Sequence, residues 1–150
     1  MNEHVCNSVS LCGQNLYALK VLKSHGLSSN ELSNVCRATL VARLTYAAPA
    51  WHGFLSAAER ARLQAVLAKA QRWGLYSKLA PDFEDIINKA DQTLFQSVLS
   101  NSTHVLHPLL PPIKQSKCNL RQRAHNRALP TKSSLTERNF IARMIFREAY

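Results

Sequence analysis

Glycine is scarce in this sequence, and its four copies stand singly at Gly13, Gly26, Gly53 and Gly74. A phosphate-cradling loop needs clustered glycines so that the backbone can approach the ligand, and the sequence therefore excludes one. No apolar run approaches the roughly 20 residues of a membrane-spanning helix. The opening MNEHVCNSVS also lacks the basic and then apolar order of a targeting peptide. We expect an intracellular chain, nuclear or cytoplasmic, with no membrane partner, cofactor or small-molecule substrate.

Cysteine motifs are missing as well. The four cysteines Cys6, Cys12, Cys36 and Cys118 form no CxxC unit, which predicts free thiols in a reducing compartment. For Cys6, Cys12 and Cys36 we expect burial in the core. The alternative is a zinc site built from His104, His107, Cys118 and His125, whose spacing matches no common structural zinc motif. We therefore predict no metal site, and zinc binding by these four residues stays open.

Acidic residues are few, and they are fewest in the last quarter of the chain. From Lys114 to Tyr150 nine Lys and Arg face only Glu137 and Glu148, so this segment carries most of the net charge of +10. Such a concentration favours a phosphate backbone, because each neutralised phosphate releases counterions. A solvated cationic tail and a surface for an acidic protein partner are the alternatives. The predicted phosphate contacts are Lys114, Lys117, Arg121, Arg123 and Arg127.

Helical periodicity and start signals run through residues 1–103. Apolar side chains recur at helical spacing over 5–19 and 32–44, and Gly26 is placed to end the first helix. Ser28 with Glu31 and Ser56 with Glu59 have the spacing of capping boxes, which predicts helix starts at both places. The second of these helices should end at Gly74 in a left-handed cap.

A further helical stretch should begin near Pro81 and Asp82, with acidic residues in its first turn. We expect Asp91 to break this stretch into two helices.

The C-terminal region differs in composition. Three prolines within residues 104–112 predict an extended segment that lies across the helices through Leu106, Leu109 and Leu110. A short helix should follow near residues 140–145. The sequence thus predicts an all-α fold, a small bundle of four to five helices over residues 1–103, followed by an extended, Pro-rich, basic arm over 104–150.

Five segments, taken in order, resemble one protein family. They are LYALKVLKSHGL (16–27), RATLVARLTYAAPAWHGF (37–54), HVLHPLLPP (104–112), NLRQRAH (119–125) and NFIARMIFREAY (139–150). Together they are similar to the C-terminal region of the reverse transcriptases of non-LTR retrotransposons of the jockey and CR1-like type. The resemblance implies a thumb and tail that hold RNA or an RNA–DNA duplex beside the fingers and palm. The apolar face of residues 5–19 would then pack on that palm.

Polymerase chemistry needs paired carboxylates that hold two metal ions. In this family they include two adjacent aspartates, and the sequence has no such pair among Asp82, Asp85 and Asp91. We therefore assign no catalytic residue and expect no enzymatic activity from this chain. The functional alternatives are a helical protein-interaction module whose basic arm binds an acidic partner, and a relic fragment without function.

Overall fold

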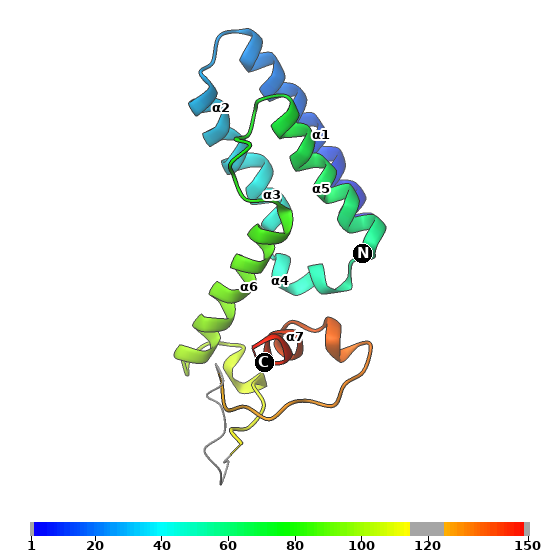
Figure 1. Cartoon of the computed structure of the whole chain (residues 1–150), viewed down its shortest axis with the longest axis vertical. Coiled ribbons are helices and arrows are strands. Elements are labelled where there is room, and N and C mark those ends of the chain that lie inside the picture. Colours follow the sequence, from blue (N-terminus) through cyan, green and yellow to red (C-terminus); the bar gives the residue numbers. More distant parts are fainter. Residues whose placement is uncertain (1, 115–124, 149–150) are drawn as a thin grey trace.

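The computed structural model describes residues 2–114 and 125–148, and these form an all-α fold. Extended pairing in the described part of the chain is limited to one isolated antiparallel bridge between Ile113 and Arg127. The predicted fold class is confirmed. The longer helices, shown in Figure 1, are α1 (Asn2–Ser24), α2 (Ser29–Cys36), α5 (Ala57–Arg72), α6 (Phe83–Ser100) and α7 (Phe140–Arg147). None of the described helices combines the length and apolar character needed to span a membrane.

Local sequence signals set most helix boundaries. Both capping boxes form, because Ser28 and Ser56 each accept a hydrogen bond from the amide three residues on, while Glu31 and Glu59 reach back to the cap. Gly26 follows α1 with φ +90° and Gly74 follows α5 with φ +64°, left-handed conformations that favour glycine. These predictions are confirmed, as is the start of α6 at Asp82, whose side chain caps the amide of Asp85.

The second helical region is one continuous rod with a change of pitch. Helix α2 passes into a π-helical turn, η1 (Arg37–Val41), and then into α3 (Ala42–Thr45). Ala47 then adopts φ 50° and turns the chain into the short helix α4 (Ala48–Trp51), near whose start Pro49 lies. The 3₁₀ turn η2 (His52–Phe54) completes this corner. Trp51 is buried there and donates through Nε1 to the Tyr46 carbonyl at 2.9 Å, so it packs as an interior residue.

Helix α1 buries its apolar face within the chain. Val5, Cys12, Leu16 and Leu19 lie in one core with α2, α5 and the start of α6, and each is at most 2% exposed. The expectation that this face would pack on a palm is therefore wrong, because α5 and α2 occupy it. Cys12 and Cys36 are buried as predicted, but Cys6 is exposed and lies beside the guanidinium of Arg62.

Helix α6 is continuous from Phe83 to Ser100, so the predicted break at Asp91 is wrong. The low helix propensity of aspartate costs only about 0.7 kcal/mol. Asp91 is instead a buried residue of the helix that faces Arg143 of α7. The packing of α6 into both hydrophobic cores overrides this weak local preference.

A second core joins the C-terminal half of α6 to the segments that follow. Phe95 and Val98 of α6 pack with Leu110 and with Phe140, Ile141, Met144 and Ile145 of α7. Leu106 also contacts this core, whereas Leu109 is 64% exposed, so the predicted contact of Leu109 is wrong. The 3₁₀ turn η3 (His107–Leu109) bends the chain there and directs Leu109 outward.

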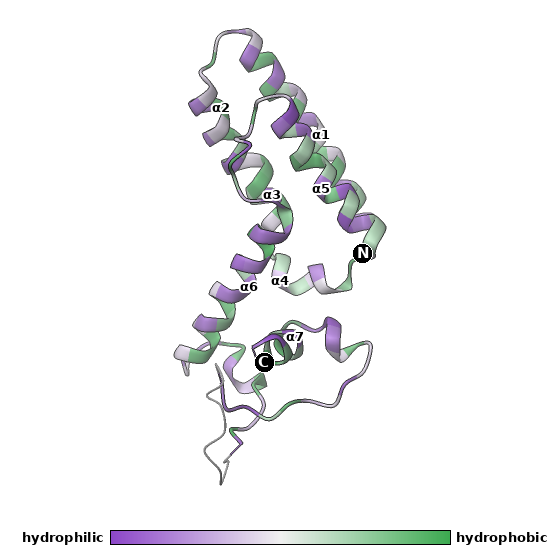
Figure 2. Cartoon of the chain, in the orientation of Figure 1, coloured by the Kyte–Doolittle hydropathy of each residue, from purple (hydrophilic) through white to green (hydrophobic). Residues whose placement is uncertain are grey.

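The predicted terminal helix is confirmed as α7, which lies below α4 and beside the lower half of α6 (Figure 1). Figure 2 shows apolar and polar residues interspersed along the helices, as expected where each helix buries one face. The division of the chain at residues 103 and 104 stays a prediction.

Candidate nucleic-acid interface

We call residues 114–127 the basic segment, because they contain the five predicted phosphate contacts. The two ends of this segment meet in one short antiparallel pairing. The Lys114 amide donates to the Asn126 carbonyl at 2.7 Å, and the Ala128 amide donates to the Pro112 carbonyl at 2.9 Å. These two hydrogen bonds flank the bridge between Ile113 and Arg127. The structure thus brings Lys114 and Arg127 together at the base of the segment, while Lys117, Arg121 and Arg123 lie outside the described residues.

The two described basic residues have different surroundings. Lys114 is exposed. Arg127 is half-buried and donates from Nη1 to the Pro111 carbonyl at 3.0 Å. A guanidinium has five N–H donors, so Arg127 keeps donors for a phosphate while it fixes the adjacent chain.

His125 ties the base of the basic segment to α7. Its Nδ1 accepts from the Arg127 amide at 3.2 Å, which places the ring proton on Nε2, and Nε2 donates to the Ile145 carbonyl at 2.9 Å. The ring is 8% exposed and packs edge-on against Phe95 with centroids 6.3 Å apart. The base of the segment is therefore held by the second core.

The histidines of the alternative zinc site make separate local hydrogen bonds. Nδ1 of His107 lies 2.8 Å from the Val98 carbonyl, and Nδ1 of His104 accepts from the Leu106 amide at 3.1 Å. Cys118 lies outside the described residues. Across residues 2–114 and 125–148, no three His, Cys, Asp or Glu side chains gather as metal ligands would.

A buried charged cluster fastens α7 to the rest of the chain. Nη2 of Arg143 donates to Oδ2 of Asp91 at 2.9 Å and lies 3.5 Å from the Pro49 carbonyl. Nη1 of the same guanidinium donates to the Arg138 carbonyl at 3.2 Å. Arg143 therefore joins α4, α6 and the turn η4 (Thr136–Arg138) that precedes α7. Burial raises the pKa of Asp91, although the neighbouring Arg143 opposes that shift.

His52 lies against this cluster as a neutral side chain. Its Nε2 is 3.6 Å from Oδ2 of Asp91, a distance at which a protonated ring would form an ion pair. Burial, together with the positive charges of Arg143 and Arg60, lowers the pKa of His52 to about 4. The ring is therefore uncharged at neutral pH, and Asp91 with Arg143 is the ion pair of this cluster.

Two basic side chains of α5 and one of α1 make contacts within the chain. Nε of Arg60 lies 3.3 Å from Oε1 of Glu84. The ammonium of Lys69 lies 4.6 Å from the centre of the Trp73 ring, and that of Lys20 lies 5.3 Å from it. Aromatic rings attract cations at these distances. Arg60 and Lys69, near opposite ends of α5, are therefore engaged within the chain and are weaker candidates for phosphate contacts.

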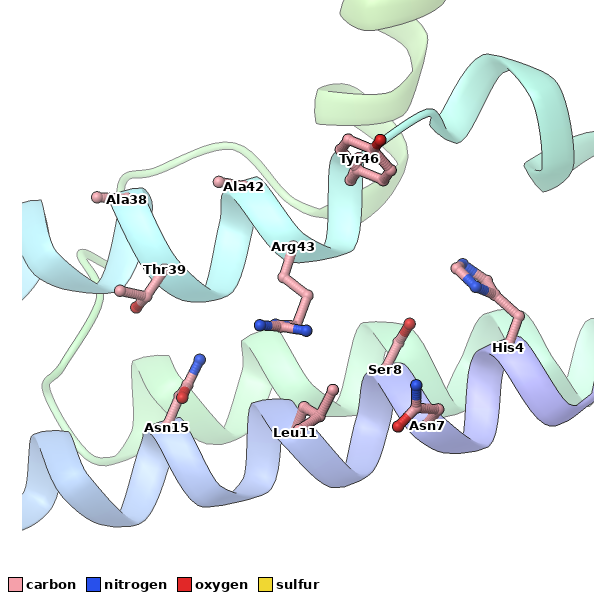
Figure 3. Close-up of a pocket in the computed structure, with 10 residues that line it drawn as sticks. All are labelled: His4, Asn7, Ser8, Leu11, Asn15, Ala38, Thr39, Ala42, Arg43 and Tyr46. Atoms are coloured by element: carbon pink, nitrogen blue, oxygen red, sulfur yellow. The ribbon is translucent and has the colours of Figure 1, made fainter.

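Sequence reasoning missed an open groove between α1 and the rod formed by η1 and α3. It has a volume of about 620 Å³, and Arg43 extends from α3 across it toward α1 (Figure 3). The detectable signal was a row of polar side chains at helical spacing on α1. The lining residues are His4, Asn7, Ser8, Leu11, Asn15, Ala38, Thr39, Ala42, Arg43 and Tyr46.

Comparisons of the chain with protein-family models, with curated proteins and with solved structures found no match.

Proposed function

We propose that this chain binds the phosphate backbone of a nucleic-acid duplex, as the thumb and tail region of a non-LTR retrotransposon reverse transcriptase. The fingers and palm of such an enzyme would carry out the polymerase chemistry, and this chain would contribute only duplex binding. The proposal rests on the resemblance of its five segments and on its charge. The net charge of +10 comes from 19 basic and nine acidic residues.

The observation that carries the proposal is the anchorage of the basic segment. Residues 114 and 125–128 are held side by side by backbone hydrogen bonds, and His125 joins them to α7. Between these ends the sequence places Lys117, Arg121 and Arg123 without an acidic residue. A cationic segment with a fixed base loses less conformational entropy on binding than a free tail does. Phosphate contacts of this kind give affinity with little sequence preference.

The test is a salt titration of binding to a short RNA–DNA hybrid, with circular dichroism recorded on the same sample. The logarithm of the binding constant should fall linearly with the logarithm of salt concentration between about 50 and 200 mM. Replacing Arg121, Arg123 and Arg127 by Gln should reduce the magnitude of that slope by about 2 to 3, since each phosphate contact contributes about 0.7 to 0.9.

The matched control removes three positive charges elsewhere. Arg37, Arg72 and Lys78 are exposed residues far from the basic segment in the sequence, and the triple Gln variant has the same net charge as the arm variant. In this control variant the magnitude of the salt-dependence slope should fall much less than in the variant of Arg121, Arg123 and Arg127. Equal losses in the two variants would show that binding follows net charge alone. Helical protein that does not bind the hybrid at the lowest salt would reject the duplex role and favour a protein-interaction module.

A further inference from the structure

The groove between α1 and α3 has the dimensions of a ligand site. Its volume of about 620 Å³ lies within the range of about 300 to 1,000 Å³ that small-ligand pockets occupy. One wall consists of α1 residues that follow one another along the helix, and the other consists of η1 and α3 (Figure 3). This second wall is low because Ala38 and Ala42 have small side chains and the Thr39 hydroxyl turns back to the Val35 carbonyl at 2.7 Å.

The groove is positively charged. The guanidinium of Arg43 is the charged group on its walls, and no acidic side chain lines it. The ion pairs of the described residues involve Arg60 and Arg143, so none engages Arg43. A planar guanidinium presents paired donors to a carboxylate or a phosphate. An anionic group is thus the complementary ligand at this point of the groove.

Aromatic and amide groups also line the groove. Tyr46 is 76% exposed, and it lies with His4 at one end of the groove, beyond Arg43 (Figure 3). The His4 ring is held edge-on by Trp51 with centroids 5.0 Å apart. The side-chain amides of Asn7 and Asn15 each supply both donors and an acceptor on the α1 wall. An exposed aromatic ring and a guanidinium that line the same groove favour a planar base attached to a phosphate over a simple acid.

The backbone of the η1 wall is also unusual. The π-helical turn Arg37–Val41 contributes Ala38 and Thr39 to the groove, and Arg43 and Tyr46 follow within two turns. Single π-helical turns within helices are rare and occur frequently at functional sites.

We propose that this groove binds one nucleotide of a single-stranded nucleic acid, with the phosphate on Arg43, the base against Tyr46 and the amides of Asn7 and Asn15 at its polar edge. The site uses residues of α1 and α3 and none of the basic arm. It is therefore independent of the duplex grip proposed above, and either site can exist without the other.

The experiment measures fluorescence anisotropy of a labelled single-stranded tetranucleotide with the full chain, in a background where Arg121, Arg123 and Arg127 are replaced by Gln. Adding Arg43→Gln should weaken binding about tenfold, the loss of one charge-assisted contact. Adding Ala42→Leu should weaken it similarly without any change of charge, because the larger side chain fills the groove at an exposed helix position.

The control is Arg37→Gln in the same background. Arg37 is exposed on the same rod, one turn and a half before Arg43 and outside the groove, so its removal should change the affinity by less than about twofold. Equal effects of Arg37→Gln and Arg43→Gln would overturn the proposal, as would a background variant that no longer binds the tetranucleotide. Complete displacement of the tetranucleotide by an equal concentration of inorganic phosphate would also overturn it, since that result would assign an anion site without a base. None of these outcomes decides the proposed duplex binding. That proposal is tested by the salt titration, which compares the variant of Arg121, Arg123 and Arg127 with its charge-matched control.

Discussion

Asp91 is a carboxylate with 1% exposure in the middle of a helix. It sits between the two cores, because α6 gives Phe83 and Ile87 to the first core and Phe95 and Val98 to the second. Removing one member of a buried ion pair is costly since the other is left uncompensated. The pairing of Asp91 with Arg143 therefore holds α7 in place beneath the bundle.

Arg143→Met should destabilise the fold by about 3 to 5 kcal/mol, the typical cost of an unpaired buried charge. Protonation of Asp91, whose pKa burial already raises, reduces that loss in acid. Urea unfolding followed by circular dichroism measures the change. Arg147→Met is the matched control on the same helix, because Arg147 is exposed and donates to Oδ1 of Asn88 at the surface at 2.9 Å. Its effect should stay below about 1 kcal/mol, and an equal effect of the two variants would contradict the role of Arg143.

The lowered pKa of His52 predicts that the fold loses stability in weak acid. Its pKa in the fold is about 4, below the ordinary value of 6.5, so the unfolded chain binds the proton first as the pH falls. The stabilisation from neutral His52 is therefore complete above pH 6.5 and is lost as the pH falls toward 4. Over that window it amounts to about 3 kcal/mol. The raised pKa of Asp91 acts in the opposite direction, since the fold favours its protonated form.

The measurement compares the wild-type chain with His52→Gln by urea unfolding at about pH 7 and about pH 5. The free energy of unfolding of the wild type should fall relative to the variant between these two values. A difference between the two proteins that does not change with pH would contradict a neutral, buried His52.

Among the elements, the turn η2 and the segment before α7 meet without room for a side chain. Gly53 lies directly against the Arg138 carbonyl and the Arg143 guanidinium, and an added Cβ would overlap both. The close approach, and not a special backbone conformation, requires glycine here. The docking of α7 thus depends on contacts of η2 as well as on the buried ion pair.

Gly53→Ala should destabilise the fold by about 1 to 3 kcal/mol, since the backbone of η4 must shift. Thermal unfolding measures this, and faster hydrogen exchange in α7 would localise the shift. Gly13→Ala is the matched control, because a Cβ at Gly13 meets nothing within 4 Å. In the middle of α1 this change should stabilise the helix by about 0.5 to 1 kcal/mol. A change in stability of the same sign in Gly53→Ala and Gly13→Ala would contradict the close contact at Gly53.

At the scale of the whole molecule, the fold has two hydrophobic cores, and each core supports one of the two proposed binding surfaces. The N-terminal core assembles α1, α2, α5 and the start of α6, and it leaves the groove with Arg43 open on one side. The second core fixes both ends of the basic segment through His125 and Leu110. The salt titration and the tetranucleotide experiment therefore test two surfaces that the fold keeps apart.

The sequence by itself determined the helical class and many of the helix limits. Ser28, Ser56, Gly26 and Gly74 act on backbone groups within one turn, so their effect is visible in the local sequence. The periodicity of residues 5–19 likewise marked a buried face correctly, although its partner was assigned to the wrong protein region. Lys114 and Arg127 were selected from sequence as phosphate contacts, and that role stays a prediction.

Tertiary structure alone decided which residues that are far apart in the sequence come into contact. Asp91 and Arg143 are 52 residues apart, and only the docking of α7 turns a predicted helix breaker into a buried ion pair. The groove lies between α1 and the rod of η1 and α3, so it depends on how two segments pack and no single segment encodes it. Local signals report hydrogen bonds within a turn, whereas burial and pairing depend on which surfaces meet once the chain is folded.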